Sequence, residues 1–217
     1  MALHVLDAVA GGKPTLPKLL ERACEVARKT KETDLKLRLK LYGNGKSSID
    51  TGIGFFNHML EAFSKHSLMD LDLFCKGDLF VDFHHTVEDC GIGLGQALKN
   101  CIFPVESMER FGNGAVVMDE ACVSCDLDIS GRPYLLFDMS KAANGYMGRV
   151  GDFDVELVEE FFRALVMSAG LSVHLILQRG KNLHHITEAA FKALALGLRR
   201  AVAYNDRIQI PSTKGCL

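Results

Sequence analysis

Two short stretches of this chain share one pattern, and together they decide the expected fold: His84-His85-Thr86-Val87-Glu88 and His184-His185-Ile186-Thr187-Glu188, which start 100 residues apart. After each of them, apolar residues recur at spacings of three and four, which is typical of an amphipathic helix. One such stretch by itself is more simply explained as an exposed polar cap at the start of a helix. Its recurrence with the same spacing favours an internally duplicated unit.

The histidines and glutamates of these stretches are candidate metal ligands. His84 and Glu88 are four residues apart, and His85 and Glu88 are three apart, so on a helix either pair can close on one ion. Adjacent helical residues diverge by about 100°, so the two histidines of one stretch do not easily serve the same metal. The simplest arrangement gives each ion a His-x-x-Glu pair from one helix and the remaining histidine of the other helix. It predicts two ions related by a pseudo-twofold axis.

Position within the duplicated halves adds one ligand to each ion. His58 lies 26 residues before His84, and Glu160 lies 24 residues before His184, each on the preceding helix. The expected ligand groups are His58, His85, Glu88 and His184 for one ion, and His84, Glu160, His185 and Glu188 for the other. A nitrogen-rich set with carboxylates and no thiolate suits Mn, Fe, Co or Zn better than Ca or Mg. Four protein ligands leave positions open on an octahedral ion, which favours a catalytic site.

The composition limits the classes of protein to consider. The chain has 217 residues, of which 48% are hydrophobic, and this is ample for a core. A net charge of -2 gives no electrostatic case for binding nucleic acid or an anionic membrane surface. No apolar run reaches the length of a membrane span, and we expect a soluble, cytoplasmic protein. Seven cysteines suggest free thiols in a reducing compartment, and we interpret Cys122-Val-Ser-Cys125 as strand residues.

Local patterns predict the same order of elements in both halves. The run 35–42 alternates apolar and basic residues, as in a half-buried strand, whereas 55–66 has the period of a helix. The other expected elements are strands at 71–74, 79–81, 115–129, 134–137 and 171–177, and a helix at 155–168. The expected fold class is therefore α+β, with strands, helix, strand and helix occurring twice and the sheets packed against paired helices. Gly91, Gly93 and Gly95 fall inside a helix, so close helix packing explains them better than a nucleotide loop does.

Five longer stretches carry a resemblance to a known family. They are 50–60 (DTGIGFFNHML), 77–89 (from Gly77-Asp78 to Glu88-Asp89), 130–134 (SGRPY), 184–188 (HHITE) and 211–215 (PSTKG). Together they resemble the imidazoleglycerol-phosphate dehydratases of histidine biosynthesis, from about residue 28 to the end of the chain. The resemblance implies a pseudo-twofold fold of the ribosomal protein S5 domain 2 type. The expected division is an N-terminal extension (1–27), a first half (28–112), and a second half with a substrate-binding tail (113–217).

The resemblance also implies a reaction, a cofactor and a set of site residues. The reaction is the dehydration of D-erythro-imidazole-glycerol phosphate to imidazole-acetol phosphate by a hydro-lyase with two manganese ions per active site. The implied metal ligands are His58, His84, His85, Glu88, Glu160, His184, His185 and Glu188. The implied proton-transferring residue is Glu32, and the implied substrate-binding residues are Glu32, His66, Arg110, Arg132, Ser212, Thr213 and Lys214. The family forms a shell of 24 subunits, so further copies of this chain are the expected partners, beside the phosphate substrate.

Three positions depart from the family pattern. Many members carry histidine where this chain has Glu160, although a carboxylate can replace an imidazole on manganese. Asn57 replaces an aspartate beside His58, which could weaken the hydrogen-bond support of that ligand. Phe83 replaces a polar residue beside His84 and is expected only to pack. Nearby, Asp89 either supports a ligating histidine or supplies favourable charge at a helix start.

Less specific explanations stay open for several residues. Without the resemblance, Glu32 is most simply a solvated carboxylate at a strand edge, and Arg110 and Arg132 are surface charges. A di-iron carboxylate oxidase also uses helical Glu and His pairs, but it is usually a four-helix bundle with little sheet. A metal-storage or metal-held scaffold protein is the alternative outside the enzymes. It predicts metal binding without turnover.

Overall fold

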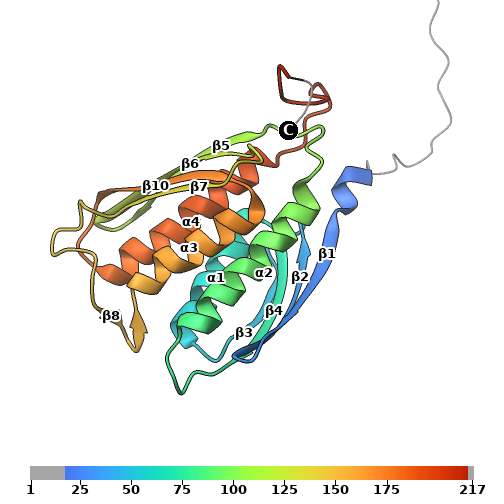
Figure 1. The fold of residues 1–217 in the computed structure, drawn as a ribbon. Helices are drawn as coiled ribbons and strands as arrows, with labels where there is room; N and C mark the ends of the chain where they lie inside the picture. Colours follow the sequence, from blue (N-terminus) through green and yellow to red (C-terminus); the bar gives the residue numbers. More distant parts are fainter. Residues whose placement is uncertain (1–17, 215–217) are drawn as a thin grey trace, which may run out of the picture.

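The computed structural model describes residues 18–214, which form two copies of one α+β unit (Figure 1). After a short 3-10 helix, η1 (Lys18–Glu21), the first copy consists of β1 (Ala23–Lys29), β2 (Thr33–Lys40), β3 (Ser47–Asp50), α1 (Gly54–Ser67), β4 (Asp70–Gly77) and α2 (His84–Ile102). The second copy consists of β5 (Phe111–Met118), β6 (Ala121–Asp128), β7 (Tyr134–Asp138), α3 (Glu156–Ala169), β10 (Ser172–Arg179) and α4 (Leu183–Ala201), with a small hairpin of β8 (Arg149–Val150) and β9 (Phe153–Asp154) before α3.

The strand order shows that the halves are copies of one topology. The first sheet has the order β1-β2-β4-β3, and the second has the equivalent order β5-β6-β10-β7. In both sheets the last pair is parallel, β3 with β4 and β7 with β10, and the other pairs are antiparallel. The duplicated α+β fold expected from the sequence is therefore confirmed.

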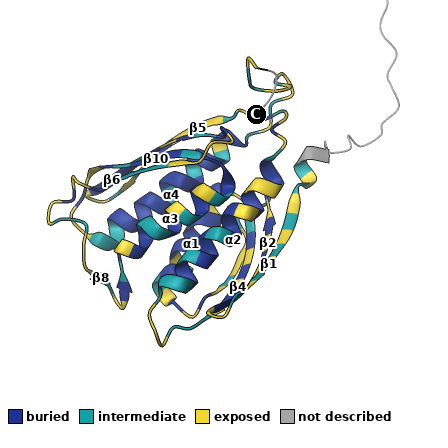
Figure 2. Cartoon of the chain, viewed as in Figure 1, coloured by how far each residue is buried: buried dark blue, intermediate teal, exposed yellow. Residues whose placement is uncertain are grey.

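The four helices lie between the two sheets, so the sheets form the outer layers (Figure 1). Strand β2 illustrates why: Leu35, Leu37 and Leu39 are buried on the helix side, and the basic residues between them face outward. The same alternation separates buried inner faces from exposed outer faces in both sheets (Figure 2). Helix α2 packs against α3 and α1 against α4, which joins the halves through one continuous core. None of the helices among residues 18–214 is both long and apolar enough to span a membrane.

The glycine series of α2 allows this close helix packing, as predicted. A Cβ atom at Gly91 would lie 2.7 Å from the Phe161 carbonyl oxygen, and one at Gly95 would lie 2.4 Å from the Leu165 carbonyl oxygen, both on α3. Gly93 faces the other way, toward Leu35 of β2. Because protein interiors are close-packed, a side chain at Gly91 or Gly95 meets the backbone of α3 and forces α2 away from it.

Three expected elements differ in the structure. Residues 79–81 form a turn and not a strand, because β4 continues without a break to Gly77 and the chain then leaves the sheet toward α2. The run 115–129 is a hairpin and not one strand, since the polar pair Asp119-Glu120 turns the chain between β5 and β6. Strand β1 already starts at Ala23, within the stretch assigned to the N-terminal extension, because Cys24 and Val26 pack against the core. Residues 1–17 lie outside the described part of the chain.

The packing of α2 on α3 is open to a direct test. We expect Gly95→Ala to lower the free energy of unfolding of the metal-free protein by about 1–3 kcal/mol, since the added methyl group has no room. Urea unfolding followed by circular dichroism measures this. Gly54→Ala at the start of α1 is the matched control, because a Cβ there meets nothing within 4 Å. An unchanged stability of Gly95→Ala would contradict the proposed close contact.

Candidate metal centre

The first two turns of α1 and α4 bring three candidate ligands together: His58, His184 and Glu188. One ligand atom from each lies within 4.8 Å of the other two. Nε2 of His184 is 3.2 Å from Oε2 of Glu188, and Nε2 of His58 is 3.6 Å from the same oxygen. Glu188 is buried, whereas the two imidazoles are partly open to solvent. Across residues 18–214, no other three His, Cys, Asp or Glu residues meet this criterion.

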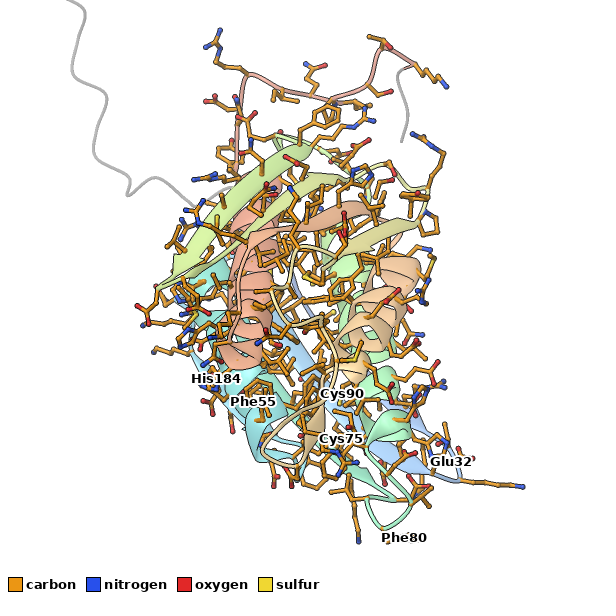
Figure 3. All side chains as sticks on the ribbon, turned by 90° about the vertical axis from the view of Figure 1, so that its left-hand side faces the viewer. Glu32, Phe55, Cys75, Phe80, Cys90 and His184 are labelled. Atoms are coloured by element: carbon orange, nitrogen blue, oxygen red, sulfur yellow. The ribbon has the colours of Figure 1, made fainter. Side chains whose placement is uncertain are left out.

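Local sequence explains how the group is held. Asn182 caps α4, since its side chain accepts hydrogen bonds from the backbone N–H groups of His184 (2.9 Å) and His185 (3.4 Å). The ring of Phe55 lies edge-on to that of His184, with 5.1 Å between the ring centroids (Figure 3). These contacts set the direction in which His184 leaves the helix.

Lys192 completes the environment of Glu188, and sequence reasoning missed it. Its Nζ lies 2.7 Å from Oε1 of Glu188, so one carboxylate oxygen is engaged by the ammonium and the other faces the histidines. Burial raises the pKa of Glu188, but the hydrogen bond and charge of Lys192 and the charges of the two histidines outweigh it, and the pKa falls below its usual value. Glu188 is thus held as a carboxylate. The available signal was the spacing of four between Glu188 and Lys192 on one helix.

Within one chain, the grouping of the candidate ligands differs from the expected division between two ions, which itself stays a prediction. Glu188 lies with His58 and His184, although it was expected to share an ion with His185 and not with His58. The reason is helical geometry: residues four apart lie nearly above one another, so His184 reaches Glu188 while His185 points to another side of α4.

The second copy of the pattern is arranged on α2 and α3. His58 and Glu160 are each the fifth residue of their helices, α1 and α3, so they occupy equivalent places in the two halves. By this equivalence, His84, Glu88 and Glu160 correspond to His184, Glu188 and His58. Their ligand atoms do not form a three-residue group within the described chain. Their role as ligands therefore stays a prediction.

The two remaining histidines each bind a carboxylate through Nδ1. Nδ1 of His85 lies 3.1 Å from Oδ2 of Asp78, and Nδ1 of His185 lies 2.8 Å from Oε2 of Glu120. These hydrogen bonds raise the pKa of both histidines, and the bond to His185 lowers the pKa of Glu120 to about 2. Asp78 lies within a stretch that the resemblance had marked, but nothing in the sequence indicated Glu120.

Glu32 lies in the exposed turn between β1 and β2, apart from His184 at the helix ends (Figure 3). Thr30 shapes this turn, because its Oγ1 accepts from the backbone N–H groups of Glu32 (3.1 Å) and Thr33 (3.0 Å). Asp89 of α2 anchors the hairpin: it accepts from Nε of Arg28 at 2.8 Å and from the Thr33 hydroxyl. Asp89 therefore supports the Glu32 turn, and neither role expected for it from the sequence is the one it takes.

The two neighbouring departures from the family pattern have simple structural explanations. The side chain of Asn57 accepts hydrogen bonds from the backbone N–H (3.0 Å) and hydroxyl (2.6 Å) of Thr51, so it fixes the start of α1 and does not bond to His58. Phe83 packs against the core, as predicted.

Among the predicted substrate-binding residues, Arg110 and the tail lie at the end of α4 opposite to His184. Arg110 donates to Asp128 at 2.7 Å and to the Pro211 carbonyl at 2.8 Å, which places the tail residues Ser212, Thr213 and Lys214 near it. Arg132 lies exposed in the loop after β6. His66, at the end of α1, lies near Lys192 and Arg199, and burial with these charges lowers its pKa.

Comparison with known proteins gives one consistent family. A family model described as imidazoleglycerol-phosphate dehydratase matches residues 51–198. The dehydratase of that name from Helicobacter hepaticus is 58% identical over 200 residues (92% of this chain, 98% of the relative), and that from Aliarcobacter butzleri is 61% identical over 193 residues (89% and 99%).

Solved structures agree with this result. The crystal structure of imidazoleglycerol-phosphate dehydratase from Staphylococcus aureus has a TM-score of 0.75 at 40% identity and covers 84% of this chain and 99% of its own. The enzyme from Pyrococcus furiosus, in complex with (S)-C348, has a TM-score of 0.75 at 36% identity, with 88% and 100% covered. The chain therefore belongs to the imidazoleglycerol-phosphate dehydratase family of hydro-lyases.

Proposed function

We propose that this chain converts D-erythro-imidazole-glycerol phosphate into imidazole-acetol phosphate and water in histidine biosynthesis, as a cytoplasmic enzyme with two manganese ions per active site. The observation that carries the metal centre is the group of His58, His184 and Glu188, whose ligand atoms lie within 4.8 Å of one another. Two imidazole nitrogens and one ionised carboxylate suit manganese and leave room for further ligands. The equivalent residues His84, Glu88 and Glu160 would hold the second ion.

In this proposal the ions and Glu32 have separate tasks. Two bound cations would supply the positive charge that stabilises the anion formed when a carbon-bound proton leaves the substrate. Glu32 is the candidate for moving that proton, because it is exposed and no other residue among 18–214 forms an ion pair with it. The bond network of Thr30, Thr33 and Asp89 would hold its turn in place.

The positions of the candidate residues support a site shared between subunits. Arg110 donates its backbone N–H to the carbonyl of Ala201 at the end of α4, at 2.8 Å. Since a helix rises 1.5 Å per residue, this end lies about 25 Å from His184 at the other. A small phosphate substrate does not span that distance. We therefore propose that one subunit supplies the metal group and another supplies Arg110, Arg132, Ser212, Thr213 and Lys214, within a shell of 24 copies.

Two alternatives were a di-iron carboxylate oxidase and a metal-storage or scaffold protein. The fold argues against the first, and a turnover assay tests the second. Two four-stranded sheets around the helices do not match the four-helix bundle of a di-iron oxidase. A storage or scaffold protein would bind manganese without turnover. Incubation of the manganese-loaded protein with imidazole-glycerol phosphate, followed by detection of the ketone product, tests the proposed reaction, and absence of product would contradict it.

Glu32→Gln tests the proton-transfer role. We expect turnover to fall by about 10²–10⁴-fold, because the amide cannot accept the proton, while manganese content stays at the wild-type level. Product formation and metal analysis on the same sample measure the two effects. Glu25→Gln, an exposed change on β1 of the same hairpin, is the matched control. Wild-type turnover of Glu32→Gln would remove Glu32 from this role.

Glu160→Ala tests the second metal group. We expect the manganese content to fall from two ions per chain to one, since the ion held by His58, His184 and Glu188 does not depend on this residue. Glu160→His should retain two ions, because imidazole is an equally suitable ligand. Elemental analysis after dialysis gives the count, with Glu159→Ala as the control on the neighbouring face of α3. Two ions in Glu160→Ala would argue against Glu160 as a ligand.

Removal of manganese tests the shared site. If metal ligands come from different subunits, chelation should leave trimers and readdition of manganese should restore the larger shell. Multi-angle light scattering measures the mass in both states. The idea fails if the mass in excess manganese equals that of the chelated protein.

A further inference from the structure

His85 and His185 differ from the other candidate ligands in how they are held. Each is outside the group formed by His58, His184 and Glu188, and each has its Nδ1 atom against a carboxylate oxygen, 3.1 Å away for His85 and 2.8 Å for His185. His58 and His184 have no such partner in the described chain, where Glu188 is the only carboxylate that contacts them.

The bond to a carboxylate decides which ring nitrogen is available. An ionised carboxylate only accepts hydrogen bonds, so Nδ1 must carry the proton, and in the neutral ring Nε2 then keeps its lone pair. For His185 the nearest acidic atom to Nε2 is Oδ2 of Asp119 at 3.9 Å, which is beyond hydrogen-bonding distance. Both rings are therefore held with Nε2 facing away from the carboxylate.

The carboxylates come from different places in the two halves. Gly77 and Gly180 are equivalent, because a Cβ at Gly77 would contact Thr86 and Thr33, and one at Gly180 would contact Ile186 and Ala121. The residue after Gly77 is Asp78, but the residue after Gly180 is Lys181, which cannot accept a hydrogen bond. In the second half the acceptor is instead Glu120, from the hairpin turn between β5 and β6.

Glu120 has an equivalent in the first half, and it is Glu32. Each glutamate directly precedes the second strand of its hairpin, β2 or β6, and both of those strands have eight residues and an alternating buried face. Glu120 holds His185, and its Oε1 also accepts from the backbone N–H of Asn182 at 2.7 Å. Glu32 makes no side-chain hydrogen bond within the described residues, because Asp78 has taken its place at His85.

We propose that Asp78 and Glu120 are positioning residues that orient His85 and His185, so that Nε2 of each ring binds an ion of the proposed centre held mainly by another subunit. Asp78 has the additional effect of leaving Glu32 free for proton transfer. This inference rests on the proposed function. It adds two residues that bind neither the metal nor the substrate. Carboxylate partners of this kind are usual for metal-bound histidines, and their loss typically weakens metal binding about 10–100-fold.

Manganese titration of the full-length, metal-free protein by isothermal calorimetry tests the proposal. We expect Asp78→Ala and Glu120→Ala each to weaken one of the two binding steps about 10–100-fold. Glu120→Gln should fall between Glu120→Ala and wild type, because its amide oxygen still accepts from Nδ1. Glu106→Ala removes an exposed charge at the far end of α2 and should bind manganese like wild type.

The outcomes separate this proposal from the one on which it rests. Wild-type protein that binds no manganese would overturn the metal centre itself. Wild-type protein that binds two ions, with Asp78→Ala and Glu120→Ala within twofold of its affinities, would overturn only the positioning role. Loss of affinity together with a changed near-ultraviolet circular dichroism spectrum of the metal-free variant would show a general structural role and would also overturn it. Weakened binding with an unchanged spectrum supports the proposal.

Discussion

A turn of α-helix holds about 3.6 residues, and this period determines what each His-His pair can do. One histidine of the pair, His184, lies above Glu188 and reaches it at 3.2 Å. Its neighbour His185 is turned away and is held by Glu120 instead. The two histidines of one pair therefore lie in two different groups of side chains, one with Glu188 and one with Glu120. A centre built from such pairs, as we propose, is composite, because the group of His58, His184 and Glu188 leaves His185 outside it.

The duplicated fold presents these pairs at matching positions. Close packing at Gly91 and Gly95 lets α2 approach α3, and α1 packs on α4 in the equivalent way. The sheets cover the outside of the four helices, so the first turns of α2 and α4, which carry the pairs, lie at the ends of rigid elements (Figure 1). Ligands on such elements keep their geometry better than ligands on loops. The chain thus combines helix ends that carry the candidate ligands with hairpin turns that carry the additional carboxylates.

Duplication has been followed by divergence at the hairpin turns. Glu32 and Glu120 hold equivalent places, yet Glu120 is bonded to a histidine and Glu32 is exposed to solvent. The residue after each equivalent glycine differs as well, Asp78 in the first half and Lys181 in the second. An aspartate accepts the hydrogen bond of the histidine and a lysine does not. The two halves therefore surround equivalent positions with different contacts, which a strictly symmetric pair of sites would not show.

The sequence by itself determined the duplicated α+β fold, the helices that carry the His-His pairs, the equivalence of His58 and Glu160, and the family. These features depend on local periodicity and on motifs of several residues, both of which are visible along the chain. The predictions of a strand at 79–81 and of a single strand at 115–129 were wrong. Apolar content alone does not mark where a chain leaves a sheet. Only the tertiary structure decided that His184 pairs with Glu188, that Lys192 contacts Glu188, that Asp78 and Glu120 contact His85 and His185, and that Asp89 anchors the turn of Glu32. Such contacts join residues up to 65 positions apart, and the direction of each side chain depends on how helices and hairpins pack in three dimensions.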